Sequence, residues 1–394
     1  MTRVGTGLWA AALIALSGAL GVPRAQAQAP GAAAVDSTPL LAVAAIGARE
    51  AATRLEGRPT ARASVRNTAA AQYNAGLAQL AKGQFDSAAV SLRAATTTLP
   101  DVARYHGDLA FALAASGHWT DAEEEYRAAV RLQQANPWYY IGLGTTQLAQ
   151  GHWAQSSASY TLAVSSDSAV IIRQLIEPAG DAFEKSGNAE ELTAWSRMAT
   201  VRFPSVPTPW LRLASAAFQG HDTATGFPAI RRYRTLKPDD RVGALLYAEF
   251  LYAAGQNDSA AILAVQASPD SSLRHLASVM LYNAGGNLLQ ASKFDTAARV
   301  LQQGRDIAAE QDRPRFELLL GIARLRLLQP LYNEAATNND CRKAPVADSM
   351  ITDVIHLETA GGAADSSMAN QVLRAAAQYR TAIDGFMKQC GHGR

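Results

Sequence analysis

The sequence is poor in cysteine and in net charge, and both shortages exclude classes of protein. It has 2 cysteines among 394 residues, which excludes a disulfide-dense small scaffold and metal sites built from several cysteines. Lysine and arginine number 36 against 34 aspartate and glutamate residues, so the formal charge of +2 gives no basic footprint for nucleic acid. Apolar residues make up 48 % of this long chain, which is enough to bury a sizeable core and excludes wholesale disorder.

Residues 1–27 have the three parts of a secretory signal peptide. Arg3 supplies a positive charge, residues 4–22 form an apolar run, and Ala25-Gln26-Ala27 is a small-x-small cleavage site. The run is long enough for a retained transmembrane helix, but glycines interrupt it and Pro23 ends it. We therefore expect an exported protein, periplasmic or secreted, with no stable membrane insertion after cleavage.

The middle of the chain repeats itself every 34 residues. Three glycines with this spacing are followed at fixed offsets by an aromatic residue, a small residue, a bulky residue and an alanine. The five sets are Gly83, Gly117 and Gly151; Phe85, Trp119 and Trp153; Ala88, Ala122 and Ser156; Leu92, Tyr126 and Tyr160; Ala95, Ala129 and Ala163. A glycine ends a helix cheaply, and small residues let two helices approach closely.

This pattern resembles the tetratricopeptide (TPR) repeat, which pairs a helix A with a helix B in each unit. The resemblance implies an all-α, right-handed superhelical solenoid of stacked helix pairs. We expect about seven units over 69–312, strongest over 69–170. An Ala-rich linker and an N-terminal capping helix are expected over 28–68, and an irregular helical cap over 313–394, where Pro330 should end a helix that begins near residue 315.

The sequence contains no recognisable catalytic, nucleotide or metal motif, so no catalytic residue, cofactor or metal ion is predicted. His118 and His152 each precede a turn tryptophan, but they stand one repeat apart and are interpreted as solvated turn residues. Glu123, Glu124 and Glu125 point in different directions on a helix and are interpreted as a polar face.

In TPR proteins that bind extended peptides, helix A lines the concave side. Matching the family's inward positions to this sequence gives an apolar and aromatic end next to an acidic middle, and Phe111 and Trp138 are expected to anchor a partner. The residues of this predicted groove are Tyr73, Leu77, Arg104, Phe111, Trp138, Ile141, Glu177, Asp181, Phe218 and Tyr252. The lysine, asparagine and arginine set with which some TPR proteins grip a C-terminal carboxylate is missing.

The leading hypothesis is a non-enzymatic scaffold of a bacterial-type cell envelope that binds a protein or an extended peptide. Two alternatives stay open: an all-α enzyme acting on polysaccharide, and a helper of envelope polymer export. Because export places the chain in an oxidising compartment, Cys341 and Cys390 are predicted to form one disulfide that fastens the last helix to the cap. The identity of the partner and the oligomeric state cannot be derived from the sequence.

Overall fold

The computed structural model describes residues 63–360 and 367–391, and the expected signal peptide and most of the expected N-terminal cap lie outside these ranges. The described residues form α-helices joined by short turns and 3-10 segments, without a β-strand among them. The prediction of an all-α fold built from stacked helix pairs is therefore confirmed. Over the same ranges, none of the helices combines the length and the apolar character needed to cross a membrane.

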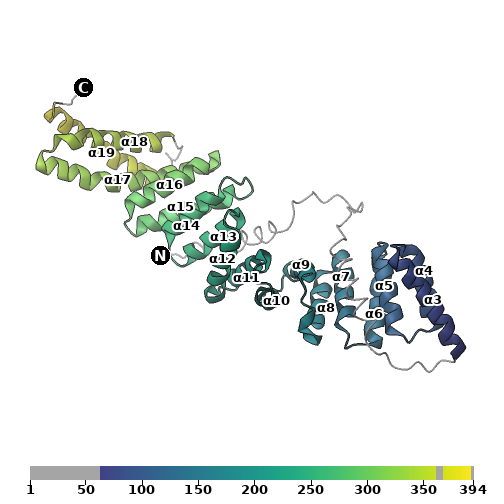
Figure 1. Cartoon of the computed structure of the whole chain (residues 1–394). Helices are drawn as coiled ribbons and strands as arrows, with labels where there is room; N and C mark the ends of the chain where they lie inside the picture. Colours follow the sequence, from purple (N-terminus) through teal and green to yellow (C-terminus); the bar gives the residue numbers. More distant parts are fainter. Residues whose placement is uncertain (1–62, 361–366, 392–394) are drawn as a thin grey trace. The chain divides into compact units, whose positions relative to one another are not determined.

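The chain forms two compact units that divide between Ala229 and Ile230. The first unit holds the helices that carry the clear 34-residue period (Figure 1). In order these are α3 (Ala63–Ala81), α4 (Phe85–Thr98), α5 (Ala103–Ala115), α6 (Trp119–Leu132), α7 (Pro137–Ala149), α8 (Trp153–Ser166), α9 (Ile176–Ser186), α10 (Ala189–Arg202) and α11 (Pro207–Gln219). Helix α12 (Thr223–Leu236) contains the division between the units.

Each helix A packs against the helix B that follows it, in the pairs α3/α4, α5/α6, α7/α8 and α9/α10. The small residues of the repeat lie where the two helices cross. A Cβ atom added at Gly76 would come within 2.5 Å of Leu92 on the paired helix, so only glycine allows this approach. Helix α3 begins at Ala63, ahead of residue 69, where the sequence predicts the start of the first repeat.

Left-handed turns join helix A to helix B, as the repeated glycine predicts. Gly83, Gly117 and Gly151 all have φ between 71° and 82°. The fifth repeat has no glycine at this point, and His221 adopts φ 55° there instead. The left-handed turn is therefore kept in the fifth repeat without a glycine.

The fourth helix pair departs from the regular array. Two 3-10 turns, Ser168–Val170 and Arg173–Leu175, come between α8 and α9. Val170, Ile171 and Leu175 from this connection are buried in the core that also holds Trp195 of α10. The insertion is apolar and packed, which explains why the sequence pattern weakens after residue 170 while the helix pairing continues.

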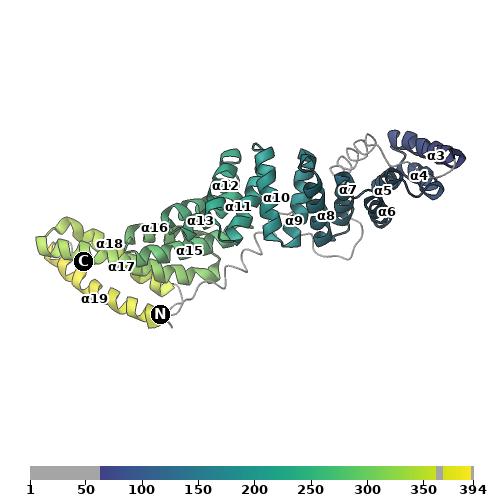
Figure 2. The same ribbon diagram turned by 90° about the horizontal axis from the view of Figure 1, so that it is seen from below.

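The second unit begins within α12 and contains two further helix pairs and a C-terminal bundle. Figure 2 shows α17, α18 and α19 of this bundle. Its helices are α13 (Arg241–Ala253), α14 (Asn257–Ala267), α15 (Arg274–Gln290), α16 (Phe294–Ile307), α17 (Arg313–Asn338), α18 (Ala344–Ala360) and α19 (Ser367–Gln389). The expectation that Pro330 ends a helix was wrong, because α17 continues through it. Proline removes a single backbone donor, and packing of Leu328 and Ala335 into buried cores on either side holds the helix together.

The C-terminal bundle contains the disulfide that the sequence predicts. Cys341 follows α17 and Cys390 follows α19, and their Cα atoms lie 5.4 Å apart in the bonded pair. Tyr332 of α17 packs edge-on against Tyr379 and Phe386 of α19 nearby. The bond and this aromatic cluster fasten the last helix to the helix that opens the bundle.

Candidate partner-binding surface

The ten residues of the predicted groove differ widely in exposure. Tyr73, Phe111, Trp138 and Ile141 are buried, and Arg104, Asp181, Phe218 and Tyr252 are intermediate. Leu77 and Glu177 are exposed. Phe111 and Trp138, the aromatic residues expected to anchor a partner, are therefore buried in the protein, and the accessible side chains of the predicted groove are at other positions.

In the first two repeats the groove residues contact one another. The Tyr73 hydroxyl donates a hydrogen bond to the Asp108 carboxylate, and both side chains are buried. The Arg104 guanidinium lies 4.8 Å from the centre of the Tyr73 ring, which also stacks on Tyr105 with 4.5 Å between ring centres. Since Tyr73 belongs to α3 and the others to α5, these contacts connect two successive helices A.

The aromatic residues expected to anchor a partner are also part of the packing. Phe111 meets Phe85 edge-on with 6.2 Å between ring centres. Trp138 and Ile141 belong to the buried cluster that contains Tyr160 and Phe183. Replacing Phe111 and Trp138 together would therefore remove core contacts.

An acidic face on α9 is the part of the groove that stays accessible. Glu177, Asp181 and Glu184 follow one another at helical spacing, so they share one side of α9. The Glu177 and Asp181 side chains are 54 % and 43 % exposed, whereas that of Glu184 is 17 % exposed. We call these three residues the α9 acidic face.

A buried arginine from α11 lies against the α9 acidic face. The Arg212 Nη1 atom is 3.0 Å from Glu177 Oε2, and its Nε atom is 3.3 Å from Glu184 Oε2. Its Nη2 atom pairs with Asp181. The guanidinium therefore contacts all three carboxylates, while Lys185, the lysine of α9, lies over the Trp153 ring at 4.5 Å.

Gly180 makes this arrangement possible. A Cβ atom at this position would lie 2.1 Å from Arg212 Nη1, so a larger residue would force the guanidinium out of its place. The absence of a side chain lets the guanidinium reach the backbone of α9, where it also contacts the Ile176 carbonyl oxygen at 3.4 Å.

The charge of the α9 acidic face is not balanced by Arg212. Three carboxylates share one guanidinium, which leaves an excess of negative charge. Burial raises the pKa of the Asp181 and Glu184 carboxyls above their ordinary values, and the attraction of Arg212 offsets only part of that shift. Lys185 of α9 also acts on both carboxyls, and the face still holds more carboxylates than cations.

Glu249 occupies the position on α13 that Asp181 occupies on α9. Its side chain is 4 % exposed, and its Oε2 atom is buried without a hydrogen bond from any described residue. Burial raises the pKa of Glu249 to about 8. This carboxyl therefore holds its proton at neutral pH.

Sequence reasoning missed Asp108 and Arg212, the two residues that contact the groove positions from the following helix A. Both stand 35 residues after their partners, Tyr73 and Glu177. The repeat spacing, applied from one helix A to the next, could have identified Asp108 and Arg212. The three carboxylates on one face of α9 were a further signal that a cation lies nearby.

The interpretation of Glu123, Glu124 and Glu125 as a polar face holds only for Glu124. Glu123 is not part of a solvated face: it is buried and accepts hydrogen bonds from Gln147 at 3.1 Å and Gln150 at 2.7 Å. Glu125 pairs with His106, and only Glu124 is exposed. His118 and His152 are exposed as expected, and nowhere in the described ranges do three or more histidine, cysteine, aspartate or glutamate side chains gather as a metal site.

The paired helices, the 34-residue period and the left-handed turns give this chain the fold of a TPR-type helical-repeat protein. No protein-family model matches the sequence, and no curated protein does. Among solved structures, it is similar to PilF of Pseudomonas aeruginosa, with 18 % identity over 52 % of this chain and 93 % of that chain and a TM-score of 0.36.

Two other solved structures are similar at comparable levels. A tetratricopeptide repeat protein from Parabacteroides merdae is 13 % identical over 70 % of this chain and 98 % of that one, with a TM-score of 0.36. A chain of the Naa15/Naa10 complex bound to HypK-THB is 11 % identical, with a TM-score of 0.48, and the match covers 82 % of this chain and 55 % of that chain.

Proposed function

We propose that this protein is a non-enzymatic scaffold that holds a protein or an extended peptide on its helix-A side, with a basic segment of the partner against the α9 acidic face. The observation that carries the proposal is the shared guanidinium: Arg212 is buried beneath three carboxylates, two of which remain substantially exposed. Buried and fixed in place, Arg212 orients the carboxylates but leaves an uncompensated negative surface. Lysine or arginine side chains of a partner are complementary to such a surface.

The site of action in this proposal is outside the cytoplasm. The support comes from residues 1–27, which have the composition of a signal peptide, and from the disulfide between Cys341 and Cys390. Disulfides persist in oxidising compartments such as the periplasm. The mature chain would then begin near residue 28 and act in the envelope or beyond it.

The test compares binding of a defined set of peptides to matched charge variants. Extended 12-residue peptides with lysine and arginine, and the same peptides with neutral replacements, are titrated by fluorescence anisotropy. The double variant Glu177→Gln/Asp181→Asn should bind the basic peptides about tenfold more weakly, and added salt should weaken wild-type binding.

The control variant Glu124→Gln/Glu190→Gln removes the same charge from exposed positions on two helices B. It should bind like the wild-type protein. Equal affinity of both double variants, or equal affinity for basic and neutral peptides, would overturn the assignment of the α9 acidic face.

A further inference from the structure

His106 of α5 is held between two hydrogen-bond acceptors. Its Nε2 atom is 2.8 Å from the Pro100 carbonyl oxygen, in the connection between α4 and α5. Its Nδ1 atom is 2.6 Å from Oε2 of Glu125 on α6. The imidazole side chain is 14 % exposed; its contact with Glu125 is partly buried, and its contact with Pro100 lies at the surface. The ring thus joins the first repeat to both helices of the second.

The chemistry of these two acceptors fixes the protons on the ring. A carbonyl oxygen and a carboxylate can only accept hydrogen bonds, and a neutral imidazole carries one N–H and one lone pair. Both contacts are hydrogen bonds only when both ring nitrogens are protonated. When the ring loses a proton, one contact sets a nitrogen lone pair against an oxygen, and that contact is lost.

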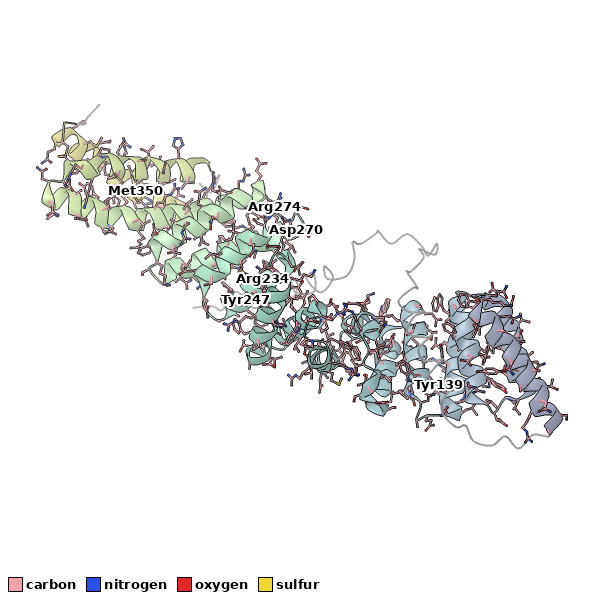
Figure 3. All side chains as sticks on the ribbon, viewed as in Figure 1. Tyr139, Arg234, Tyr247, Asp270, Arg274 and Met350 are labelled. Atoms are coloured by element: carbon pink, nitrogen blue, oxygen red, sulfur yellow. A yellow bond between two sulfur atoms is a disulfide. The ribbon has the colours of Figure 1, made fainter. Side chains whose placement is uncertain are left out.

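The hydrogen bond from a helix-A side chain to a carbonyl oxygen six residues earlier occurs elsewhere in the molecule, with donors that do not titrate near neutral pH. At the position of His106 in its repeat, Trp210 of α11 donates from Nε1 to the Pro204 carbonyl oxygen at 3.0 Å. Arg274, labelled in Figure 3, donates from Nε to the Ser268 carbonyl oxygen at 3.3 Å. Each acceptor stands six residues before its donor. Indole and guanidinium groups do not lose these protons near neutral pH.

We propose that the contacts of His106 with Glu125 and Pro100 form a proton-dependent joint between the first two repeats, closed when the ring carries both protons and open when it loses one. The joint lies within one turn of Arg104, Tyr105 and Asp108, the residues that contact α3. Opening therefore loosens the contact of α5 with α3. The regulation concerns the array itself and holds whether or not the α9 acidic face binds a basic partner.

The direction of the pH effect follows from the groups around the ring. Burial lowers the pKa of His106, but the hydrogen bonds to Glu125 and Pro100 and the charge of Glu125 outweigh burial and raise the pKa above its ordinary value. The positive charge of Arg131 on α6 lowers the pKa, but by less than the hydrogen bonds to Glu125 and Pro100 and the charge of Glu125 raise it. The joint therefore stabilises the folded state fully below about pH 6.5 and loses this contribution as the pH rises through the raised pKa.

Two measurements on the mature chain test the joint. Nitrogen NMR of histidine-labelled protein should show both ring nitrogens of His106 protonated at pH 6.5, with a midpoint of titration above that value. Hydrogen exchange, corrected for the intrinsic rate, should show protection of residues 100–108 falling about tenfold between pH 6 and pH 8.5 for each unit by which the pKa is raised. Protection of residues 204–212, around Trp210, should stay constant and serves as the internal reference.

Glu125→Gln is the matched variant. Its amide can donate to the lone pair of a neutral ring while Nε2–H donates to Pro100, so both contacts survive deprotonation. Protection of residues 100–108 should then be independent of pH. The proposal is overturned if wild-type protection stays constant over this range, if the His106 midpoint lies at or below 6.5, or if Glu125→Gln loses protection as the wild type does.

Discussion

The first and fourth repeats use the same position on helix A for opposite purposes. In the first repeat the position holds Tyr73, which is buried and bonded to Asp108 on the next helix A. In the fourth it holds Glu177, which is exposed and paired with Arg212 on the next helix A. The spacing between the partners is 35 residues in both cases, so the backbone register is the same.

The difference shows that the groove of this protein is not a uniform surface. Where the helix-A position carries an aromatic ring, the ring packs between repeats and becomes part of the structure. In the fourth repeat the Glu177 side chain stays half-exposed, and the buried Arg212 pairs with it. The residue at this one position is therefore part of the packing in the first repeat and remains accessible in the fourth.

Removing the buried arginine should produce the largest effect. Arg212→Met leaves three carboxylates close together without their shared cation. Breaking a fully buried ion pair costs about 3–5 kcal/mol, and hydration of the half-exposed Glu177 and Asp181 carboxylates offsets part of that cost. Chemical denaturation should show this loss, and hydrogen exchange should place it in α9–α11. Combining Arg212→Met with Asp181→Asn should recover part of the stability. An unchanged unfolding midpoint in Arg212→Met would show that this ion-pair cluster does not stabilise the fold.

Glu249 extends the comparison to a carboxyl without a cation. Its pKa of about 8 lies above the ordinary value of 4.5, so ionisation destabilises the folded state progressively as the pH rises from 4.5 to 8. Glu249→Gln should therefore stabilise the protein by about 2 kcal/mol or more at pH 8 and hardly at all at pH 4. Thermal unfolding at both pH values measures it, and an equal change at both would contradict the assignment.

A methyl group at Gly180 should disturb the acidic repeat through its arginine. Gly180→Ala places a Cβ atom where Arg212 lies, and overpacking of this kind costs about 1–3 kcal/mol. Gly286→Ala is the control, because this helical glycine has nothing within 4 Å of an added Cβ atom and the change should be neutral or slightly stabilising. Equal losses in the two variants, by chemical denaturation, would refute the close approach of Arg212.

The smallest effect is expected in the aromatic repeat. Tyr73→Phe removes the hydroxyl that donates to Asp108 but keeps the ring against Tyr105 and Arg104. The expected loss in the free energy of unfolding is about 1.5 kcal/mol, the lower end of the range for a hydrogen bond to a charged group, because the ring contacts are kept. The affinity for basic peptides at the α9 acidic face should not change. A changed affinity would mean that the first repeat also contributes to peptide binding.

The sequence predicted those features that depend on short-range pattern. The turn glycines, the small residues at helix crossings and the disulfide between two lone cysteines all follow from spacing or from compartment. Features that depend on tertiary contacts could not be predicted in this way. Helix α17 continues past Pro330 because packing outweighs one missing backbone donor. Glu123 is buried because Gln147 of α7 and Gln150, directly after α7, donate hydrogen bonds to it. Exposure of the groove residues also depends on the neighbouring repeat, which is why Tyr73 and Glu177 could not be told apart.

The central proposal is that a partner docks on the helix-A side, and site-specific photo-crosslinking in the cells that make the protein tests it most directly. A benzophenone amino acid is placed at Leu77 or Glu177 on helices A, and at Val90 or Val201 on helices B, where the side chains are 72 % and 79 % exposed. The account predicts a crosslinked partner from the helix-A positions, strongest at Glu177, and none from the helix-B positions. Crosslinks of equal yield from Val90 and Val201, or from those positions alone, would contradict it.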